Sequence, residues 1–319
     1  MTPLDPFENS SALLGLRRFD LPRILHAARS PGVAPMPADT TAPKCLEDSV
    51  SSALMSPPPA QTPPQLIDLP GATFTMGRAD RRPDERPPHL VRLAPFRAAR
   101  TPVSNAEYAR FVADVAADAA PFSCDAGFDA SDQPVVGVSW FQAAAYCVWL
   151  GERAGLPLRL PTEAEREFAA LGGRAQVDWP WGDADPATCT ELDFIAAAAG
   201  PHAPRPACAN GYGLRCMADN VHEWCLEPYE RSYAARAHSS PAVPNADAPL
   251  PGPGSIDPDQ RRVSRGGSWR HRVKFTRVSA RSSLRPGARY NDYGFRVYAS
   301  GIGESPRLAL ARPAIHRAP

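Results

Sequence analysis

Three short stretches carry the sequence of a capping box, and they constrain the fold more than any other feature. In each, a Ser or Thr is followed three residues later by Glu or Gln, at Ser104 to Glu107, Ser139 to Gln142 and Thr162 to Glu165. The first hydroxyl can accept from the last backbone N–H, while the last side chain reaches back. Behind the boxes, apolar residues recur at helical spacing in AEYARFVADVAADAA, FQAAAYCVWLGERAG and EAEREFAALGG. The sequence therefore predicts three helices, the last two ending at glycine.

The strand signals are short. ATFTMG at Ala72 to Gly77 and HLVRLAPF at His89 to Phe96 alternate apolar and polar residues over a few positions, which is typical of half-buried strands. From Trp179 onward the chain is rich in Pro, Gly, Trp and Asn and has no long periodic run. We therefore expect an α+β domain with little regular structure.

Proline divides the chain into a domain with extensions. The 319 residues include 38 prolines, more than twice the usual share of about 5%. Nine fall between Pro31 and Gln65, without apolar periodicity, as in flexible or polyproline-like linkers. We predict an N-terminal extension at 1–30 with a short helix interrupted by Pro22, a Pro-rich linker at 31–65, a domain at 66–300 and a disordered tail at 301–319. The extension is interpreted as an idle terminus, with a docking peptide as the alternative.

Charge and hydropathy exclude some classes of protein. The net charge of +1 argues against a nucleic-acid binder that uses its whole surface. No secretory signal is visible at the N-terminus, and no apolar run reaches the roughly 20 residues of a membrane span. We expect a cytoplasmic protein without nucleic-acid or membrane partners.

The seven cysteines show no CxxC pair and no zinc-ligand spacing. We expect free thiols, with Cys147 packed in the apolar run AAAYCVWL. The alternative is a redox pair or a soft-metal site among the four cysteines from 189 to 225, which are Cys189, Cys208, Cys216 and Cys225.

A basic run lies near the C-terminus. From Arg261 to Asn291 there are ten Lys or Arg residues and no Asp or Glu. Either acids elsewhere in the fold pair with these residues, or the run binds an anionic ligand or a peptide carboxylate.

Eight motifs together resemble one family in order and spacing over residues 67–298. They are FTMG with DERPPHLV downstream, TPVSNAEYARF, PVVGVSWFQAAAYCVWL, LPLRLPTEAEREFAA, WPWGD, NGYGLRCMADNVHEW, RGGSW and GFRVY. The chain resembles the formylglycine-generating enzyme family, also called the sulfatase-modifying factor domain. The resemblance implies a C-type-lectin-like fold of the α+β class, with a cleft built largely by the C-terminal third. Its members include copper-dependent oxidases, iron-dependent sulfoxide synthases, siderophore-tailoring proteins and hypervariable ligand binders, so fold alone does not fix function.

The resemblance places the two copper-binding cysteines of the oxidases at His271 and Thr276. Linear Cu(I) needs soft sulfur ligands, whereas a threonine hydroxyl stays protonated at neutral pH. No cysteine follows Cys225. Copper and formylglycine generation are therefore not expected.

Iron and calcium stay open. In the sulfoxide synthases the iron-binding histidines come mainly from a separate N-terminal domain, so iron here would need an improvised set of His89, His222 and His271. The family's structural calcium site corresponds to CMADNVHEW, where Asn220 and Glu223 are kept and Asp219 could compensate for a carboxylate lost at Cys216. The alternative is a metal-free, helix-like turn in which Asn220 and Glu223 satisfy backbone groups.

The expected ligand cleft combines aromatic, basic and hydroxyl side chains, a mixture that recognition surfaces favour. We expect the arginines at 277, 281 and 296 to be structural and paired with buried acids. The cleft residues predicted from the sequence are Trp269, Arg270, His271, Arg272, Phe275, Thr276, Tyr290, Asn291 and Tyr293.

Two functions compete. The first is a non-catalytic module that binds a peptide, a protein or a small-molecule ligand, with 270–293 as a diversified segment in one version. The second is a metal-dependent oxidoreductase of the siderophore-tailoring or nonheme-iron kind. Metal analysis and oxygen consumption separate them.

Overall fold

The structure is a computed structural model that describes residues 64–184, 186, 200–218, 220–238, 256–270 and 275–301. The predicted N-terminal extension, nearly all of the Pro-rich linker and nearly all of the C-terminal tail lie outside these residues. So do Cys45, Cys189, Asp219, His271 and Arg272, and the side chain of Cys208.

All three predicted helices form, and both halves of each capping box are present. They are α3 (Asn105–Val115), α4 (Trp140–Ala154) and α5 (Glu163–Leu171). Helices α4 and α5 end at Gly155 and Gly172, which adopt the left-handed conformation. Helix α3 is shorter than predicted, because Ala116 turns left-handed at φ 51°. The tail AADAA offers the core only alanine, and Ala120 reaches the core from the loop that follows.

The strands form three small sheets. The first has the order β1-β4-β10-β5 and is antiparallel throughout, the second is the pair β2-β3, and the third has the order β8-β7-β6-β9 with β6 and β9 parallel. The strands are β1 (Leu66–Leu69), β2 (Ala72–Met76), β3 (His89–Leu93), β4 (Phe96–Ala99), β5 (Leu158–Arg159), β6 (His222–Pro228), β7 (Arg262–Arg265), β8 (Arg281–Leu284), β9 (Tyr293–Gly294) and β10 (Tyr298–Ser300).

Two local expectations were wrong. The single strand expected at 89–96 is split between two sheets, because β3 pairs with β2 while β4 pairs with β1 and β10. Pro95 lies at the break and has no N–H to continue a ladder. The helix-like turn considered before Trp224 is instead the start of β6, whose His222 and Glu223 pair with β9.

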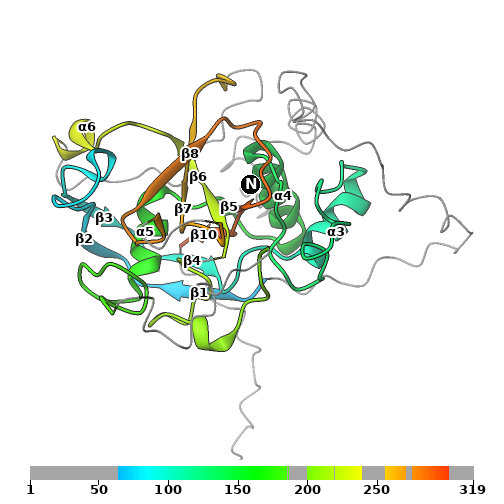
Figure 1. The fold of residues 1–319 in the computed structure, drawn as a ribbon, viewed down its shortest axis with the longest axis horizontal. Coiled ribbons are helices and arrows are strands. Elements are labelled where there is room, and N and C mark those ends of the chain that lie inside the picture. The colour runs from blue at the N-terminus through cyan, green and yellow to red at the C-terminus, as the bar shows by residue number, and fades with distance from the viewer. Residues whose placement is uncertain are drawn as a thin grey trace, which may run out of the picture.

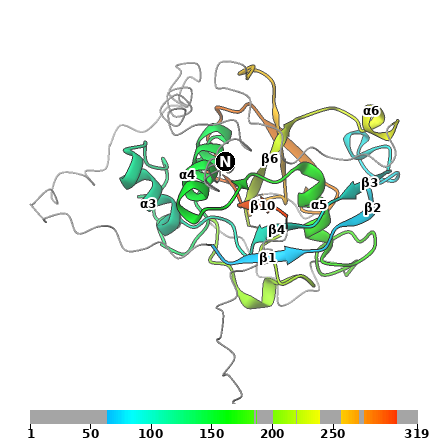
Figure 2. The same ribbon diagram turned by 180° about the vertical axis from the view of Figure 1, so that it is seen from behind.

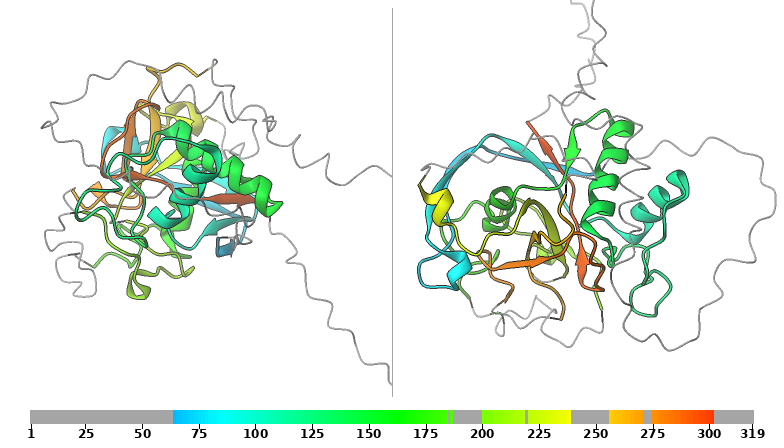
Figure 3. Two further views of the ribbon diagram at one scale, coloured as in Figure 1. Left: turned by 90° about the vertical axis from the view of Figure 1, so that its right-hand side faces the viewer. Right: turned by 90° about the horizontal axis from the view of Figure 1, so that it is seen from above.

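The helices and sheets divide the molecule into two flanks. Helices α3 and α4 lie together on one flank, and β2, β3 and the short helix α6 (Ala234–Ala237) lie on the other (Figures 1 and 2). Seen from above, α5 lies inside the ring of strands, whereas α4 stands at its edge (Figure 3). One hydrophobic cluster surrounds α4 and the other packs around α5.

Helix α5 is buried on every side, although four of its nine residues are charged. Its carboxylates and its guanidinium pair with strands that surround it: Glu165 with Arg159 at 2.7 Å, and Arg166 with Glu223 at 2.8 Å. Burying charges is tolerated only when they are paired and hydrogen-bonded. These ion pairs therefore fix the position of α5 against β5 and β6.

No helix among the described residues is long and apolar enough to cross a membrane.

Candidate ligand pocket

The RGGSW turn needs its glycines. Gly266 and Gly267 have φ of 98° and 67°, and a Cβ on Gly267 would lie 2.7 Å from Cγ2 of Thr276. The turn therefore packs directly against Thr276, which is 1% exposed. Its Oγ1 accepts a hydrogen bond of 3.3 Å from Nε1 of Trp179. The place that the resemblance assigns to the second family cysteine holds a buried, hydrogen-bonded hydroxyl.

Several predicted cleft residues do come together at the surface. Nη1 of Arg270 donates to Oδ1 of Asn291 at 3.0 Å, and Nε1 of Trp269 donates to the Asn291 carbonyl at 3.4 Å. The Arg270 guanidinium lies over the Trp269 ring, 5.7 Å from its centroid. Tyr290, which is 50% exposed, lies 6.3 Å from Tyr293 between ring centroids. The two segments predicted to form one cleft are thus neighbours.

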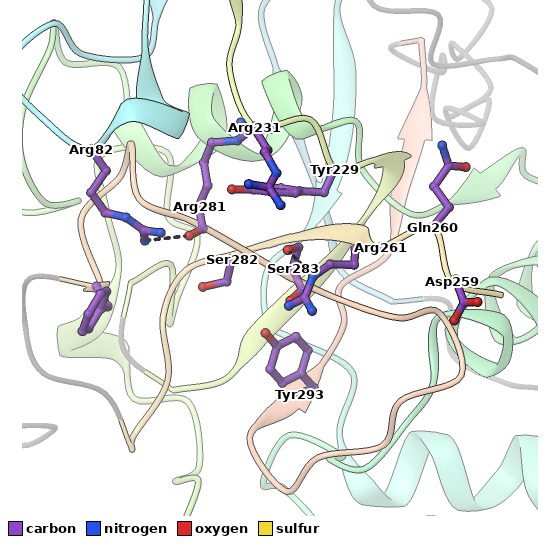
Figure 4. A pocket seen from close by; sticks show the side chains of 11 residues that line it. Arg82, Tyr229, Arg231, Asp259, Gln260, Arg261, Arg281, Ser282, Ser283 and Tyr293 are labelled. Atoms are coloured by element: carbon purple, nitrogen blue, oxygen red, sulfur yellow. Dashed lines mark hydrogen bonds between the residues drawn. The ribbon is translucent and has the colours of Figure 1, made fainter. Parts of the chain in front are cut away.

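A hollow lies beside these residues, over the β6-β7-β8 sheet. Its volume is about 770 Å³, within the roughly 300–1,000 Å³ of sites for drug-sized ligands. In Figure 4, Arg82 and Arg281 lie at one end, Asp259 and Gln260 at the other, and Arg261 with Ser283 between them. The lining residues are Arg82, Tyr229, Arg231, Asp259, Gln260, Arg261, Phe275, Arg281, Ser282, Ser283 and Tyr293. We call this hollow the arginine pocket.

Two of its four arginines, Arg281 and Arg82, are paired with acidic side chains. Nε of Arg281 donates to Glu163 at 2.5 Å, and Arg82 lies 3.3 Å from Asp84 while donating to the Arg281 carbonyl at 3.2 Å. Burial alone would raise the pKa of Glu163, but Arg265, Arg281 and Arg236 together hold it well below its usual range. Glu163 is therefore an anion, and Arg281 is held in place by it.

The other two arginines have no acidic partner among the described residues. Nε of Arg261 donates to Oγ of Ser283 at 2.9 Å, and its Nη2 donates to the Ser283 carbonyl. Arg231 forms no hydrogen bond or ion pair within the described chain. The one acid in the lining, Asp259, already pairs with Arg285 at 3.1 Å. The pocket therefore offers two uncompensated guanidinium groups to an anion.

The described thiols contribute nothing to this pocket. Cys124 is exposed, Cys147, Cys216 and Cys225 are buried, and none of these four lines the pocket. Burial raises the pKa of Cys147 and of Cys225, so these two stay protonated thiols. The expectation that Cys147 packs in the core is confirmed.

Calcium at Asn220 and Glu223 stays a prediction, but both side chains have protein partners. Oδ1 of Asn220 accepts from the N–H of His202 at 3.1 Å, and its Nδ2 donates to the His202 carbonyl at 2.6 Å. Glu223 pairs at 2.8 Å with both Arg166 and Arg296. A calcium ion on Glu223 would have to displace a guanidinium.

The histidines proposed for iron are placed apart in the fold. His89, at the start of β3, packs on Tyr233 with ring centroids 4.9 Å apart, whereas His222, in β6, packs on Tyr293 at 4.7 Å. Within the described ranges, no three His, Cys, Asp or Glu residues cluster as a metal site would require.

The three arginines expected to be structural are so. Arg277 pairs with Glu85 at 2.9 Å, Arg281 with Glu163 at 2.5 Å and Arg296 with Glu223 at 2.8 Å, and all three acids are 0% exposed. Arg281 also lines the pocket, which the sequence did not indicate.

Sequence reasoning found only part of the pocket. Phe275 and Tyr293 were predicted, and Arg261 began the basic run that was read as a candidate for anions. Arg82 and Arg231 were missed, because each lies in a different loop far from that run in sequence. No local pattern marks them.

The chain resembles known proteins over most of its described length. The family model of the sulfatase-modifying factor enzyme 1-like domain matches residues 51–300. The formylglycine-generating enzyme of Streptomyces coelicolor is 32% identical over 312 residues, covering 77% of this chain and 93% of that protein.

The chain is also similar to part of a protein kinase and to a solved structure of a variable protein. The serine/threonine-protein kinase Pkn1 of Chlamydia trachomatis is 30% identical over 251 residues, which are 73% of this chain and 38% of the kinase. The chain thus spans well under half the length of that relative. The solved structure of Treponema denticola variable protein 1 superimposes with a TM-score of 0.58 at 23% identity, over 73% of this chain and 94% of that one. At that identity the likeness concerns the fold.

Proposed function

This chain belongs to the sulfatase-modifying factor enzyme 1-like domain family, and from that premise we propose that it is a binding module for an anionic ligand, not a formylglycine-generating oxidase. The ligand, a small molecule or part of a peptide or protein, occupies the arginine pocket. The observation that carries this proposal is the pair of uncompensated guanidinium groups, Arg231 and Arg261, in a hollow of about 770 Å³.

The lining suits an anion attached to a flat or apolar group. Arg261 is already oriented by Ser283, so little side-chain freedom is lost when it binds. The rings of Tyr229, Phe275 and Tyr293 supply apolar surface beside the arginines. Hydrogen bonds between a guanidinium and an anion contribute about 1.5–3 kcal/mol each.

The environment of Thr276 argues against the copper chemistry of the oxidases. Its hydroxyl is 1% exposed and accepts from Trp179, and a protonated hydroxyl is a poor ligand for Cu(I). A sulfur ligand would have to come from elsewhere in the chain.

Calorimetric titration of three probes tests the binding function. We expect phenyl phosphate and benzoate to bind the full chain, and neutral benzamide to bind at least about tenfold more weakly, because each guanidinium hydrogen bond is worth more than a factor of ten. The double variant Arg231→Gln with Arg261→Gln should weaken both anions by a similar factor.

Arg97→Gln is the matched control. Arg97, in β4, donates to the carbonyl of Gly301 at 3.2 Å and does not line the pocket or pair with an acid that does, so its loss should leave the affinities unchanged. Equal binding of benzamide and benzoate, or no effect of the double variant, would contradict the proposal.

Metal analysis of the purified chain, with oxygen uptake on candidate thiol and siderophore substrates, separates binding from oxidation. Stoichiometric copper or iron together with oxygen consumption would replace the binding module by the oxidoreductase. Calcium bound without oxygen uptake agrees with the binding module and with the calcium site proposed at Asn220 and Glu223.

A further inference from the structure

A second, smaller cavity lies apart from the arginine pocket and shares no lining residue with it. Its volume is about 160 Å³, well below the roughly 300 Å³ at which drug-sized ligand sites begin. The walls come from the start of the described chain, from the end of β4 with the loop after it, and from α3 and α4. Two single residues of the C-terminal half, Arg215 and Val297, complete them. The lining residues are Pro64, Gln65, Ala99, Arg100, Thr101, Val103, Glu107, Tyr146, Leu150, Arg215 and Val297.

Two arginines from distant parts of the sequence converge on this cavity. The N–H of Arg215 donates to the carbonyl of Arg100 at 2.9 Å, which makes the two residues direct neighbours. The Nε atom of each is buried and has no hydrogen-bond partner in the described part of the chain. Neither forms an ion pair within the described residues. Leaving a buried donor unsatisfied costs about 1–3 kcal/mol, and two adjacent like charges add repulsion.

The acid in the walls, Glu107, forms no ion pair with either arginine among the described residues. Its Oε2 accepts from the N–H and from Oγ of Ser104, both at 2.8 Å, as part of the α3 capping box. One oxygen of this carboxylate is therefore directed to the helix terminus.

The backbone that carries the two arginines is held rigidly. Arg296 donates to the carbonyls of Ala99 and Arg215 at 2.9 and 2.7 Å, and is itself fixed by the buried Glu223. The backbone from which the two side chains extend is thus positioned before any ligand arrives, and preorganisation reduces the entropy lost on binding.

We propose that this cavity binds a small carboxylate between Arg100 and Arg215. Two guanidinium groups supply the donors that a carboxylate needs. Val103, Leu150 and Val297 supply apolar surface beside the Tyr146 ring, and this surface accommodates a short aliphatic stem better than the fourth oxygen of an inorganic phosphate.

Thermal unfolding of the full chain tests the site with butyrate, inorganic phosphate and chloride at one ionic strength. A ligand that binds only the folded state raises the unfolding midpoint. We expect butyrate at ten times its dissociation constant to raise the midpoint by about 3–5 °C over chloride, and phosphate to have less effect. The variants Arg100→Gln and Arg215→Gln should abolish the shift, whereas Arg231→Gln, in the arginine pocket, should keep it.

The midpoint in chloride alone gives a second readout. Because each arginine is unpaired without a ligand, Arg215→Gln should unfold at no lower temperature than the parent chain. A drop of several degrees in chloride would assign Arg215 a structural role and overturn the proposal. So would the absence of a butyrate shift, its persistence in both Gln variants, or equal protection by phosphate. The persistence of the shift in Arg231→Gln separates this site from the proposed ligand pocket.

Discussion

The carboxylates at the centre of the molecule illustrate how single residues are tuned by their neighbours. Glu163 lies among three arginines and is ionised, with Tyr233 donating a hydrogen bond of 3.1 Å to it. Glu227, two strand residues beyond Cys225, is half-buried and accepts a hydrogen bond from the backbone N–H of Glu163 at 2.8 Å. Burial, reinforced by the negative charge of Glu163, raises the pKa of Glu227 from 4.5 to about 7.

This raised pKa predicts a pH-dependent penalty. A carboxyl group that holds its proton more tightly in the folded state destabilises the fold when it ionises, so the penalty is absent below about pH 4 and complete above about pH 7. Glu227→Gln keeps an acceptor for the Glu163 N–H and cannot ionise. The unfolding temperature of Glu227→Gln should increase relative to that of the parent chain as the pH rises from 5 to 7.5. Thermal scans across that pH range measure the difference. A difference that does not change with pH would rule out titration of Glu227 as the cause.

At the scale of elements, α5 depends on its cap as well as on its ion pairs. Oγ1 of Thr162 accepts from the N–H of Glu165 at 3.1 Å, and the Glu165 carboxylate accepts from the Thr162 N–H at 2.8 Å while pairing with Arg159. The cap therefore links the start of the helix to β5. Its loss should loosen the pairing that positions α5 inside the sheets.

Thr162→Ala should lower the free energy of unfolding by about 1–2 kcal/mol, because it removes an N-cap hydroxyl that is 1% exposed. Thr162→Ser is the matched control: it keeps the hydroxyl, loses one methyl group and should cost clearly less. Denaturant titration measures both. If the two variants lose equal stability, then packing of the methyl group, and not the cap, is the reason for this residue.

For the whole molecule, the described core is contained between Leu69 and Ala299. Both hydrophobic clusters are built from residues of the predicted domain at 66–300. The predicted extension at 1–30 is interpreted as an idle terminus, with a docking peptide as the alternative, and 31–65 as a flexible or polyproline-like linker.

On the interpretation as an idle terminus, deleting residues 1–60 should change the free energy of unfolding by less than about 1 kcal/mol, because both described clusters are built from later residues. A shorter deletion of 1–30 separates the predicted short helix from the linker. Denaturant curves of the two deletions and of the full chain give the comparison. A loss of more than about 1 kcal/mol already in the deletion of 1–30 would establish that the extension docks on the domain.

The larger arrangement was predicted unevenly. The eight motifs predicted the family, which the family model and the Streptomyces coelicolor relative confirm. They also predicted its α+β class, which the helices and strands of the structure confirm. The split of 89–96 into β3 and β4 was missed, since an alternating pattern does not specify which strands become partners. Only part of the pocket was predicted. Arg82 and Arg231 were not, because only the folding of the backbone brings these distant residues beside the basic run.

The sequence by itself determined what depends on residues a few positions apart. Each capping box joins a side chain to an N–H three residues away, so Ser104, Ser139 and Thr162 mark helix starts in any fold that tolerates a helix there. The tertiary structure alone decided which charges meet. Glu85 pairs with Arg277, and Arg100 meets Arg215, across separations in sequence at which no local energy selects a partner. Of the arginines near the C-terminus, Arg277, Arg281 and Arg296 are held by buried carboxylates, whereas Arg261 has no acidic partner among the described residues. Burial next to a fixed charge is the physical difference between these roles.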